Sequence, residues 1–247
     1  MNKVKKFFKD EFITGTKPFD WIFLGIGLAL QVVTIIFSAI ADEPDLVLSA
    51  VCSIAGCISV VLCSRGKLSQ YFFGYIQLVP YLILSMKAGF TGEVAENWFY
   101  AITMLIGIVI WIKKYKNNEQ GLVVETKNMT SNSWSLAFVI SMLGIVGLAY
   151  LFKLVPDVNK FITGDSENPQ PWMDAITTVV PVVGQMLMCF RYSDQWVFWF
   201  IEDVMSIILW AIEGNWIMVA MYIFWTANTI YGYIKWRKLS KNEIQAR

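Results

Sequence analysis

Histidine is absent from this chain of 247 residues. Its absence removes the side chain that most often serves as general base, proton relay or metal ligand at neutral pH. The sequence also has no G-x-x-x-x-G-K-[ST] motif, which excludes ATP hydrolysis through a P-loop. Charged residues make up only 16% of the chain, against about 25% in soluble domains. These absences argue against an ordinary soluble enzyme.

Cysteine is also scarce, and its positions exclude its usual structural roles. The four cysteines, Cys52, Cys57, Cys63 and Cys189, all fall inside apolar runs, so neither a disulfide framework nor a metal cluster is expected. They are typical of small core residues. No nucleophile is paired with a base, so the sequence gives no support for catalysis. We expect no catalytic residue, no metal, no cofactor and no nucleic-acid partner.

Long apolar runs dominate what is present, since 56% of the residues are hydrophobic. Each run approaches the ~20 residues that cross a ~30 Å hydrocarbon core as a helix. The sequence therefore predicts an all-α integral membrane protein in a lipid bilayer, with eight transmembrane helices. Their expected ranges are 19–40, 46–64, 68–88, 95–113, 133–154, 171–190, 194–212 and 215–236.

Lysine and arginine are distributed unevenly over the loops between these spans. Of the 20 Lys and Arg residues, all but Lys87, Lys153 and Lys160 lie near the two termini or in loops on the same side of the membrane. Cytoplasmic loops collect basic residues. The distribution therefore predicts that both termini are cytoplasmic.

An internal repeat relates two parts of the chain at an ungapped offset of 125 residues. The polar, glycine and tryptophan matches are the informative ones, because apolar identities are common in membrane spans. They include Gln70 with Gln195, Gly89 with Gly214, Gly107 with Gly232, Trp111 with Trp236 and Lys113 with Lys238. These matches predict a duplicated unit of three helices.

The duplication predicts a parallel 3+1+3 core, in which a linker helix at 133–154 joins a first bundle at 46–113 to a second at 171–236. One linking span gives both bundles the same orientation, a known transporter plan with the substrate near the midplane between the halves. Residues 19–40 would form an extra transmembrane helix. We expect a cytoplasmic amphipathic segment at 1–18 and a basic cytoplasmic tail at 237–247.

The stretch from Gln195 to Trp210 is apolar enough for a membrane, yet it carries Glu202 and Asp203 near its middle. Ionisable side chains deep in a bilayer are costly unless they face a protein interior or a wet cavity, which makes them candidates for a functional site. On a helix one stripe contains Trp196, Trp199, Asp203, Ser206 and Trp210. A carboxylate between indole rings would suit a flat cationic ligand, although packing and anchoring are the alternative role for these tryptophans.

Equivalent positions of the two bundles should line one shared cavity. Their amides and hydroxyls can hydrogen-bond a sugar, and their rings can stack on a base. For any single polar residue, a hydrogen bond between helices is the alternative. The predicted substrate-binding residues are Gln77, Tyr81, Asn97, Tyr100, Gln185, Trp196, Trp199, Asp203, Ser206, Tyr222, Trp225 and Asn228.

This pattern resembles the PnuC family of bacterial vitamin transporters, over nearly the whole chain from the second span onward. The resemblance rests on four segments: Trp196-x-x-Trp199-x-x-x-Asp203-x-x-Ser206, Tyr222-x9-Gly232-x3-Trp236, Asn97-x-x-Tyr100-x6-Gly107-x3-Trp111, and Pro171–Thr178 followed by Gln185. Nicotinamide riboside transporters of that family are the most similar. The chain departs from the family at Gln70 and Gln77, where asparagine is frequent, and in placing Glu202 beside Asp203.

The resemblance implies a SWEET-related fold, a homotrimer in the bacterial inner (cytoplasmic) membrane, and facilitated diffusion by alternating access. The implied substrate is nicotinamide riboside, an NAD precursor, with uptake completed when a cytoplasmic nicotinamide riboside kinase phosphorylates it. A pyridinium ring would suit the pocket of Trp196 and Trp199 beside Asp203. Relatives that carry thiamine or riboflavin make these vitamins alternative substrates.

Three other functions stay open at this point. A SWEET-type sugar carrier would be favoured if the tryptophans faced lipid. A sensor or structural subunit could bind a vitamin without moving it. A membrane enzyme acting on lipid or isoprenoid substrates would need acidic motifs at the cytoplasmic boundary, where the loops of this chain are basic.

Overall fold

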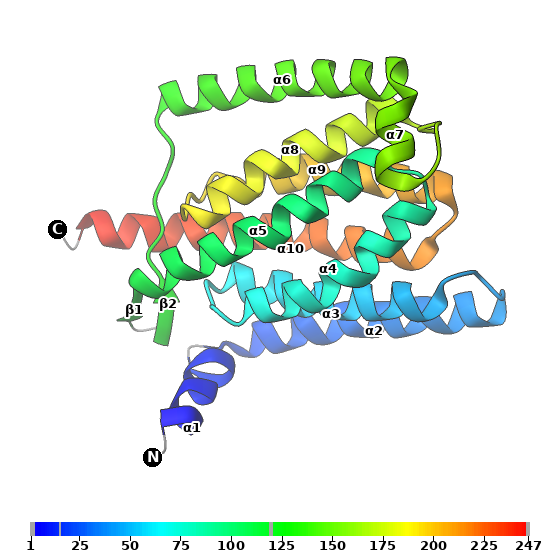
Figure 1. Cartoon of the computed structure of the whole chain (residues 1–247). Coiled ribbons are helices and arrows are strands. Elements are labelled where there is room, and N and C mark those ends of the chain that lie inside the picture. The colour runs from blue at the N-terminus through cyan, green and yellow to red at the C-terminus, as the bar shows by residue number, and fades with distance from the viewer. Residues whose placement is uncertain (1–2, 15, 119–120, 246–247) are drawn as a thin grey trace.

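The computed structural model describes residues 3–14, 16–118 and 121–245, and it is helical except for one short hairpin (Figure 1). The helices are α1 (Lys3–Phe8), η1 (Lys9–Ile13, a π-helix), α2 (Pro18–Ile40), α3 (Leu46–Ser64), α4 (Gln70–Lys87), α5 (Thr91–Lys113), α6 (Ser131–Leu154), α7 (Pro156–Thr163), α8 (Pro171–Cys189), α9 (Gln195–Glu213) and α10 (Trp216–Gln245). The hairpin pairs β1 (Tyr115–Asn118) with β2 (Gly121–Val124) in antiparallel register.

Seven helices in the described ranges are long and apolar enough to cross a membrane: α2, α3, α5, α6, α8, α9 and α10. The prediction of a polytopic helical membrane protein is therefore confirmed. The helix α4, expected as the third span, has 18 residues but carries two glutamines, a proline and a lysine. Its composition is too polar for it to be recognised as a span by hydropathy alone.

The helices α2 and α6 lie on opposite flanks of the bundle, with α3, α4, α5, α8, α9 and α10 between them (Figure 1). Both flanking helices leave large apolar side chains exposed, as Phe37 on α2 and Phe138 on α6 illustrate. Apolar faces of this size are stable where lipid or another protein covers them. The inner helices contribute most of the buried core, and they are the ones that can surround a site.

Both termini and the β-hairpin lie at the same end of the bundle (Figure 1). We call this the basic end, because it holds the basic residues Arg65, Lys67, Lys127 and Arg191. The turns and the connection that carry these residues are hydrogen-bonded to one another or to the N-terminal segment. The opposite end holds Lys87, whose ammonium is paired with Asp45. Consecutive inner helices therefore run back and forth between two chemically different ends.

The structure extends the sequence interpretation at three places. The last helix, expected to end at 236 before a separate tail, continues unbroken to Gln245, because the residues after 236 are mostly good helix formers without Gly or Pro. The helix α7 was not predicted; Pro156 begins it and Gly164, at φ 87°, ends it. The β-hairpin was also not predicted, since its strands have only four residues each.

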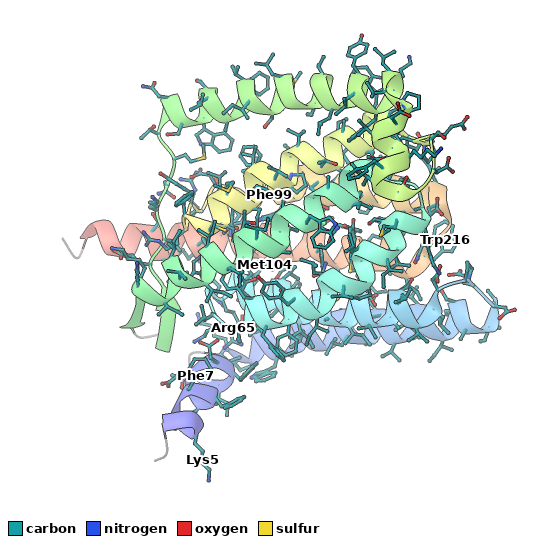
Figure 2. The ribbon with its side chains drawn as sticks, in the orientation of Figure 1. Lys5, Phe7, Arg65, Phe99, Met104 and Trp216 are labelled. Atoms are coloured by element: carbon teal, nitrogen blue, oxygen red, sulfur yellow. The ribbon has the colours of Figure 1, made fainter. Side chains whose placement is uncertain are left out.

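The N-terminal segment, expected as a surface-lying amphipathic stretch, is held against the turn between α3 and α4. Glu11 is fully buried, and its Oε2 accepts a hydrogen bond from the backbone N–H of Ser69 at 2.8 Å. Lys67 donates to the carbonyl of Asp10 at 2.7 Å, and Arg65, which lies just above the N-terminal helices in Figure 2, donates to Thr16. This segment is thus part of the folded basic end.

Contacts across the bundle at the basic end come in pairs that are related by the offset of 125 residues. The indole N–H of Trp111 donates to the carbonyl of Met188 at 3.1 Å, and that of Trp236 donates to the carbonyl of Cys63 at 3.0 Å. The sulfur atoms of Cys63 and Met188 lie 3.6 Å apart. Each half, α3–α5 or α8–α10, therefore binds the other through the same two positions.

Candidate binding cavity

A cavity of about 110 Å³ lies between the two halves, with lining residues from α3, α4 and α5 on one side and α8, α9 and α10 on the other. Met104, which Figure 2 labels near the middle of the bundle, is one of them. The cavity extends from Cys63 and Met188, toward the basic end, to Tyr81 and Tyr222, toward the opposite end. The structure therefore provides an internal chamber in the region where the sequence predicts substrate binding.

All predicted site residues except Ser206 line this cavity: Gln77, Tyr81, Asn97, Tyr100, Gln185, Trp196, Trp199, Asp203, Tyr222, Trp225 and Asn228. Ser206 is fully buried, and its hydroxyl donates to Oε1 of Glu202 at 3.0 Å. Ser206 thus orients a residue of the lining and does not reach the cavity itself. Which of the lining residues contact a ligand stays a prediction.

Aromatic side chains form two edge-to-face pairs in the lining. The rings of Tyr100 and Trp199 are 6.2 Å apart at 65°, and those of Tyr222 and Trp225 are 5.0 Å apart at 68°. The indole N–H of Trp199 donates to Gln195 one turn earlier on α9, at 3.1 Å, which fixes the plane of its ring. Rings that are held in this way can stack on a planar ligand without losing further rotational freedom.

Three of the amide side chains in the lining donate their NH₂ groups to other parts of the protein. Asn97 donates to the carbonyl of Glu93 at 2.7 Å, Gln185 donates to the hydroxyl of Thr103 at 3.2 Å, and Asn228 donates to the carbonyl of Val60 at 3.0 Å. The Oδ1 atom of Asn228 is buried and has no hydrogen-bond partner. A buried acceptor without a donor is costly, so this oxygen is available to a hydroxyl or N–H of a ligand.

A tyrosine pair closes the cavity at the end opposite the basic end. The hydroxyl groups of Tyr81 and Tyr222 are 2.7 Å apart, and Tyr81 donates to Oε2 of Glu93 at 2.6 Å. Trp210 adds a longer hydrogen bond, from its indole N–H to the Tyr81 hydroxyl at 3.4 Å. Since these residues come from α4, α5, α9 and α10, the cluster joins the two halves on this side of the cavity.

Three carboxyl groups line the cavity, namely those of Glu96, Glu202 and Asp203. The Oδ2 atom of Asp203 accepts a hydrogen bond from Thr229 at 2.8 Å. In contrast, one oxygen of Glu96 and one of Glu202 are buried without a hydrogen-bond partner. No lysine or arginine of the described chain is among the lining residues. The cavity is therefore acidic as well as aromatic.

The predicted binding residues left out part of the lining: Ser59, Val60, Cys63, Gln70, Gly74, Leu78, Glu96, Met104, Met188, Glu202 and Thr229. Of these, Glu202 had been singled out beside Asp203 as a functional-site candidate. Glu96 was detectable in principle, because it precedes Tyr100 by one helical turn and so shares its face. Cys63 and Met188 are equivalent through the offset of 125 residues, so finding either would have indicated the other. The small residues of α3 carry no such signal, since any face of that helix is apolar.

Comparisons with known proteins agree with this architecture. A family model described as nicotinamide mononucleotide transporter matches residues 46–238. The nicotinamide riboside transporter PnuC of Haemophilus influenzae is 31% identical over 94% of this chain and 96% of its own length. The PnuC protein of Neisseria mucosa is 30% identical over 94% of this chain and 86% of its own length.

A solved structure is similar as well. The crystal structure of the vitamin B3 transporter PnuC matches with a TM-score of 0.80 and 29% identity, over 96% of this chain and 98% of that chain. The match includes the inner helices that surround the cavity and the flanking helices outside them. The family model covers most of the sequence, and the relatives are similar over almost their full length. The chain therefore belongs to the PnuC family of membrane transporters.

Proposed function

We propose that this protein is a membrane transporter that takes up nicotinamide riboside. The observation that carries the proposal is the cavity between the two halves, which combines aromatic rings, amide groups and carboxyl groups without a basic side chain in the described lining. The relatives from Haemophilus influenzae and Neisseria mucosa bear the name nicotinamide riboside transporter. The cavity chemistry agrees with that substrate.

Nicotinamide riboside consists of a cationic pyridinium ring, a carboxamide and a ribose. The rings of Trp199 and Trp225 offer faces for the pyridinium, whose positive charge is attracted by indole π-systems. Gln77, Gln185 and Asn228 offer amide groups for the ribose hydroxyls and the carboxamide. We infer that the ring lies among the aromatic side chains and that the sugar lies toward these amides.

The family description names the mononucleotide, whereas the names of the relatives specify the riboside. The lining favours the riboside. A phosphate needs an arginine, a lysine or a cluster of N–H donors, and none of the described lining residues is basic. Glu96, Glu202 and Asp203 would repel a phosphate dianion. We therefore propose that the phosphorylated form is rejected.

We infer that α4 is a further membrane crossing, which gives eight transmembrane helices in all. The two termini lie at the same end of the bundle (Figure 1), and an even number of crossings is required for that arrangement. The paired contacts of Trp111 with Trp236 and of Cys63 with Met188 support the parallel 3+1+3 repeat of the SWEET-like type. Lysine and arginine at the basic end support cytoplasmic termini in a bacterial inner membrane.

We further propose alternating access, in which one half rocks against the other about the occupied cavity. The tryptophan contacts at the basic end and the Tyr81–Tyr222 pair at the other end would open in turn. Facilitated diffusion, a homotrimer and coupling to a cytoplasmic nicotinamide riboside kinase remain predictions from the family resemblance. Chemical cross-linking in the membrane tests the trimer, and uptake with and without the kinase tests the coupling.

Isothermal titration of the detergent-purified protein tests the substrate. The ligands are nicotinamide riboside, nicotinamide mononucleotide, thiamine and riboflavin, and we expect tight binding of the riboside alone. Preference for thiamine or riboflavin would retain the transporter and overturn the substrate. Binding of free sugars instead would favour a SWEET-type carrier. Flux of labelled riboside into liposomes then separates a transporter from a sensor or structural subunit, which would bind without moving it.

A further inference from the structure

The carboxyl groups of Glu96 and Glu202 each keep one buried oxygen without a hydrogen-bond partner. Glu96 comes from α5 in the first half and Glu202 from α9 in the second, and both are 5% exposed. Both line the cavity. In each side chain the Oε2 atom is buried without a hydrogen-bond partner. Glu202 was a functional-site candidate from the sequence but not one of the predicted binding residues, and Glu96 was not marked at all.

Asp203 provides an internal comparison. It lines the same cavity and is as deeply buried, at 1% exposed, but its Oδ2 accepts a hydrogen bond from Thr229 of α10. That bond ties α9 to α10, so a structural role accounts for one Asp203 oxygen. The Oε1 atom of Glu202 is similarly held by Ser206. The Oε2 atoms of Glu202 and Glu96 are buried without such a bond, although Asp203 and Tyr222 lie near the first and Tyr100 near the second.

Buried carboxylates are normally paired with a cation or hydrogen-bonded on both oxygens, because an isolated charge in an apolar region is very unfavourable. Here the chain supplies no counter-charge: it contains no histidine, and the described lining contains no lysine or arginine. Other unpartnered polar atoms lie in the same lining, namely the Tyr100 hydroxyl, the Trp225 indole N–H and Oδ1 of Asn228. The lining thus has hydrogen-bonding groups for a ligand and acidic side chains without a basic side chain in the described lining.

We propose that Glu96 and Glu202 form a charge filter that selects cationic N-glycosylpyridinium compounds over uncharged analogues of the same shape. The proposal rests on the function proposed above and assigns the specificity for charge to two named side chains, one from each half. The indole rings of Trp199 and Trp225 contribute attraction for the same charge. The carboxyl groups, when ionised, add attraction for the same charge, because opposite charges interact more strongly inside a protein than in water.

A matched pair of ligands tests the proposal. Nicotinamide riboside and its 1,4-dihydropyridine form carry the same ribose and carboxamide, but only the first has a positive charge. We expect wild-type protein to bind the cationic form at least about tenfold more tightly, which corresponds to ~1.4 kcal/mol. Glu202→Gln and Glu96→Gln keep the shape of the side chain and should each reduce this preference several-fold. The change should come from weaker binding of the cation, with the uncharged form little affected.

Glu213→Gln is the control, because Glu213 lies exposed at the end of α9, outside the cavity lining. Its preference should equal that of the wild type. The proposal is overturned if the wild type binds both forms equally, or if both glutamine variants keep the full preference. If the wild type binds neither form, the proposed substrate fails instead, so the two failures are distinguishable. Should one variant misfold, the wild-type ratio and the other variant, on a different helix, still decide.

Discussion

The two halves of the bundle are alike at the basic end and different in the cavity. At the basic end a glycine in the third helix of each half faces an aromatic ring on the second, Gly107 against Tyr71 and Gly232 against Trp196. The residue pairs are related by the offset of 125 residues. One turn later, Trp111 and Trp236 each donate a hydrogen bond to a carbonyl of the other half.

In the cavity the same offset pairs residues of different chemistry: Gln77 with Glu202, Asn97 with Tyr222 and Tyr100 with Trp225. A symmetric frame is useful where the halves pack on each other, because the same close contact is made twice. A ligand with a charged ring at one end and a sugar at the other has no such symmetry. The halves must therefore differ where they would touch it.

The turns at the basic end show both the similarity and the difference between the halves. In the first half, the N-terminal segment holds the turn before α4, through Glu11 and Lys67. In the second half, the connection before α6 holds the turn before α9: Lys127 pairs its backbone with this turn, and the N–H of Met129 donates to Asp194 at 2.6 Å. The segment before α6 also reaches the first turn, where the N–H of Val124 donates to the carbonyl of Gly66 at 3.1 Å, but only the first turn is held by the N-terminal segment. The packing of the two halves requires that the turns before α4 and α9 be held in place, and different segments can supply the hydrogen bonds that hold them.

The largest effect should come from locking the symmetric contact at the basic end. Met188→Cys introduces a thiol facing Cys63, whose Sγ now lies 3.6 Å from the Met188 sulfur. A disulfide there would join the two halves, so oxidised protein should lose riboside flux into liposomes and recover it on reduction. Cys63→Ser combined with Met188→Cys is the control that cannot cross-link. Undiminished flux in a fully cross-linked sample would exclude rocking at this contact.

Adding a methyl group at either of the paired glycines, Gly107 or Gly232, should lower the stability of the protein to a similar degree. A Cβ at Gly232 would lie 2.6 Å from the ring of Trp196, too close without a shift of the ring. Gly232→Ala and Gly107→Ala should each lower the free energy of unfolding by about 1–3 kcal/mol, the usual range for overpacking. Thermal unfolding in detergent measures this. Gly147→Ala on α6 is the control, since nothing lies within 4 Å of its added Cβ. A strong effect in one half alone would show that the halves do not share this contact equally.

Ring stacking in the asymmetric region gives the next prediction. Trp199 lines the cavity, and its equivalent in the first half is Gly74. Trp199→Ala should weaken riboside binding at least about tenfold, or ~1.4 kcal/mol. Trp98→Ala removes an indole that is 62% exposed and outside the lining, so it should leave the affinity unchanged. Equal affinities for wild type and Trp199→Ala, measured by isothermal titration, would remove Trp199 from the ring pocket.

Much of the frame was predictable from the sequence, because it depends on features that leave a periodic trace. Runs of apolar residues marked seven of the spans, and Gly107 and Trp111 revealed the repeat by recurring at Gly232 and Trp236. The helix α4 was expected as the third span, at 68–88, but does not reach the apolarity of a span. A helix that lines a cavity needs polar residues, and these lower the hydropathy on which recognition depends.

The cavity was predictable only in outline. Rings and amides at equivalent positions led to most of the lining, but Ser206 proved to be a partner of Glu202 and not a lining residue. Helical spacing could not decide between Glu202 and Asp203, because neighbouring residues point about 100° apart and either face could be inward. Glu96 was missed because it lies among other polar residues near the start of α5, where an acidic residue is expected to be exposed. Only the structure shows that it is buried.

The smallest effect concerns the N-terminal segment, which holds the turn between α3 and α4 and has no counterpart in the second half. Lys67 is 1% exposed and donates to the carbonyl of Asp10. Burial lowers the pKa of its amine from 10.5 to about 8. When the N-terminal segment detaches, water reaches this amine and its pKa returns toward the usual value. Between about pH 8 and 10.5 the detached state therefore holds a proton that the attached state has lost.

Raising the pH through this window should consequently favour attachment of the N-terminal segment. A fluorophore on Phe8→Cys reports it, because Phe8 is exposed and the four native cysteines are buried. We expect the fluorescence anisotropy to rise modestly between pH 7 and pH 9.5, and Lys67→Met, which has no titrating amine, to remove the rise. The turn before α9 has no lysine at the equivalent position, which is Tyr192, so a label near that turn should not respond. An equal rise in anisotropy with pH in Lys67→Met would assign the effect to another group. The amine of Lys67 would then have no role in the pH dependence of attachment.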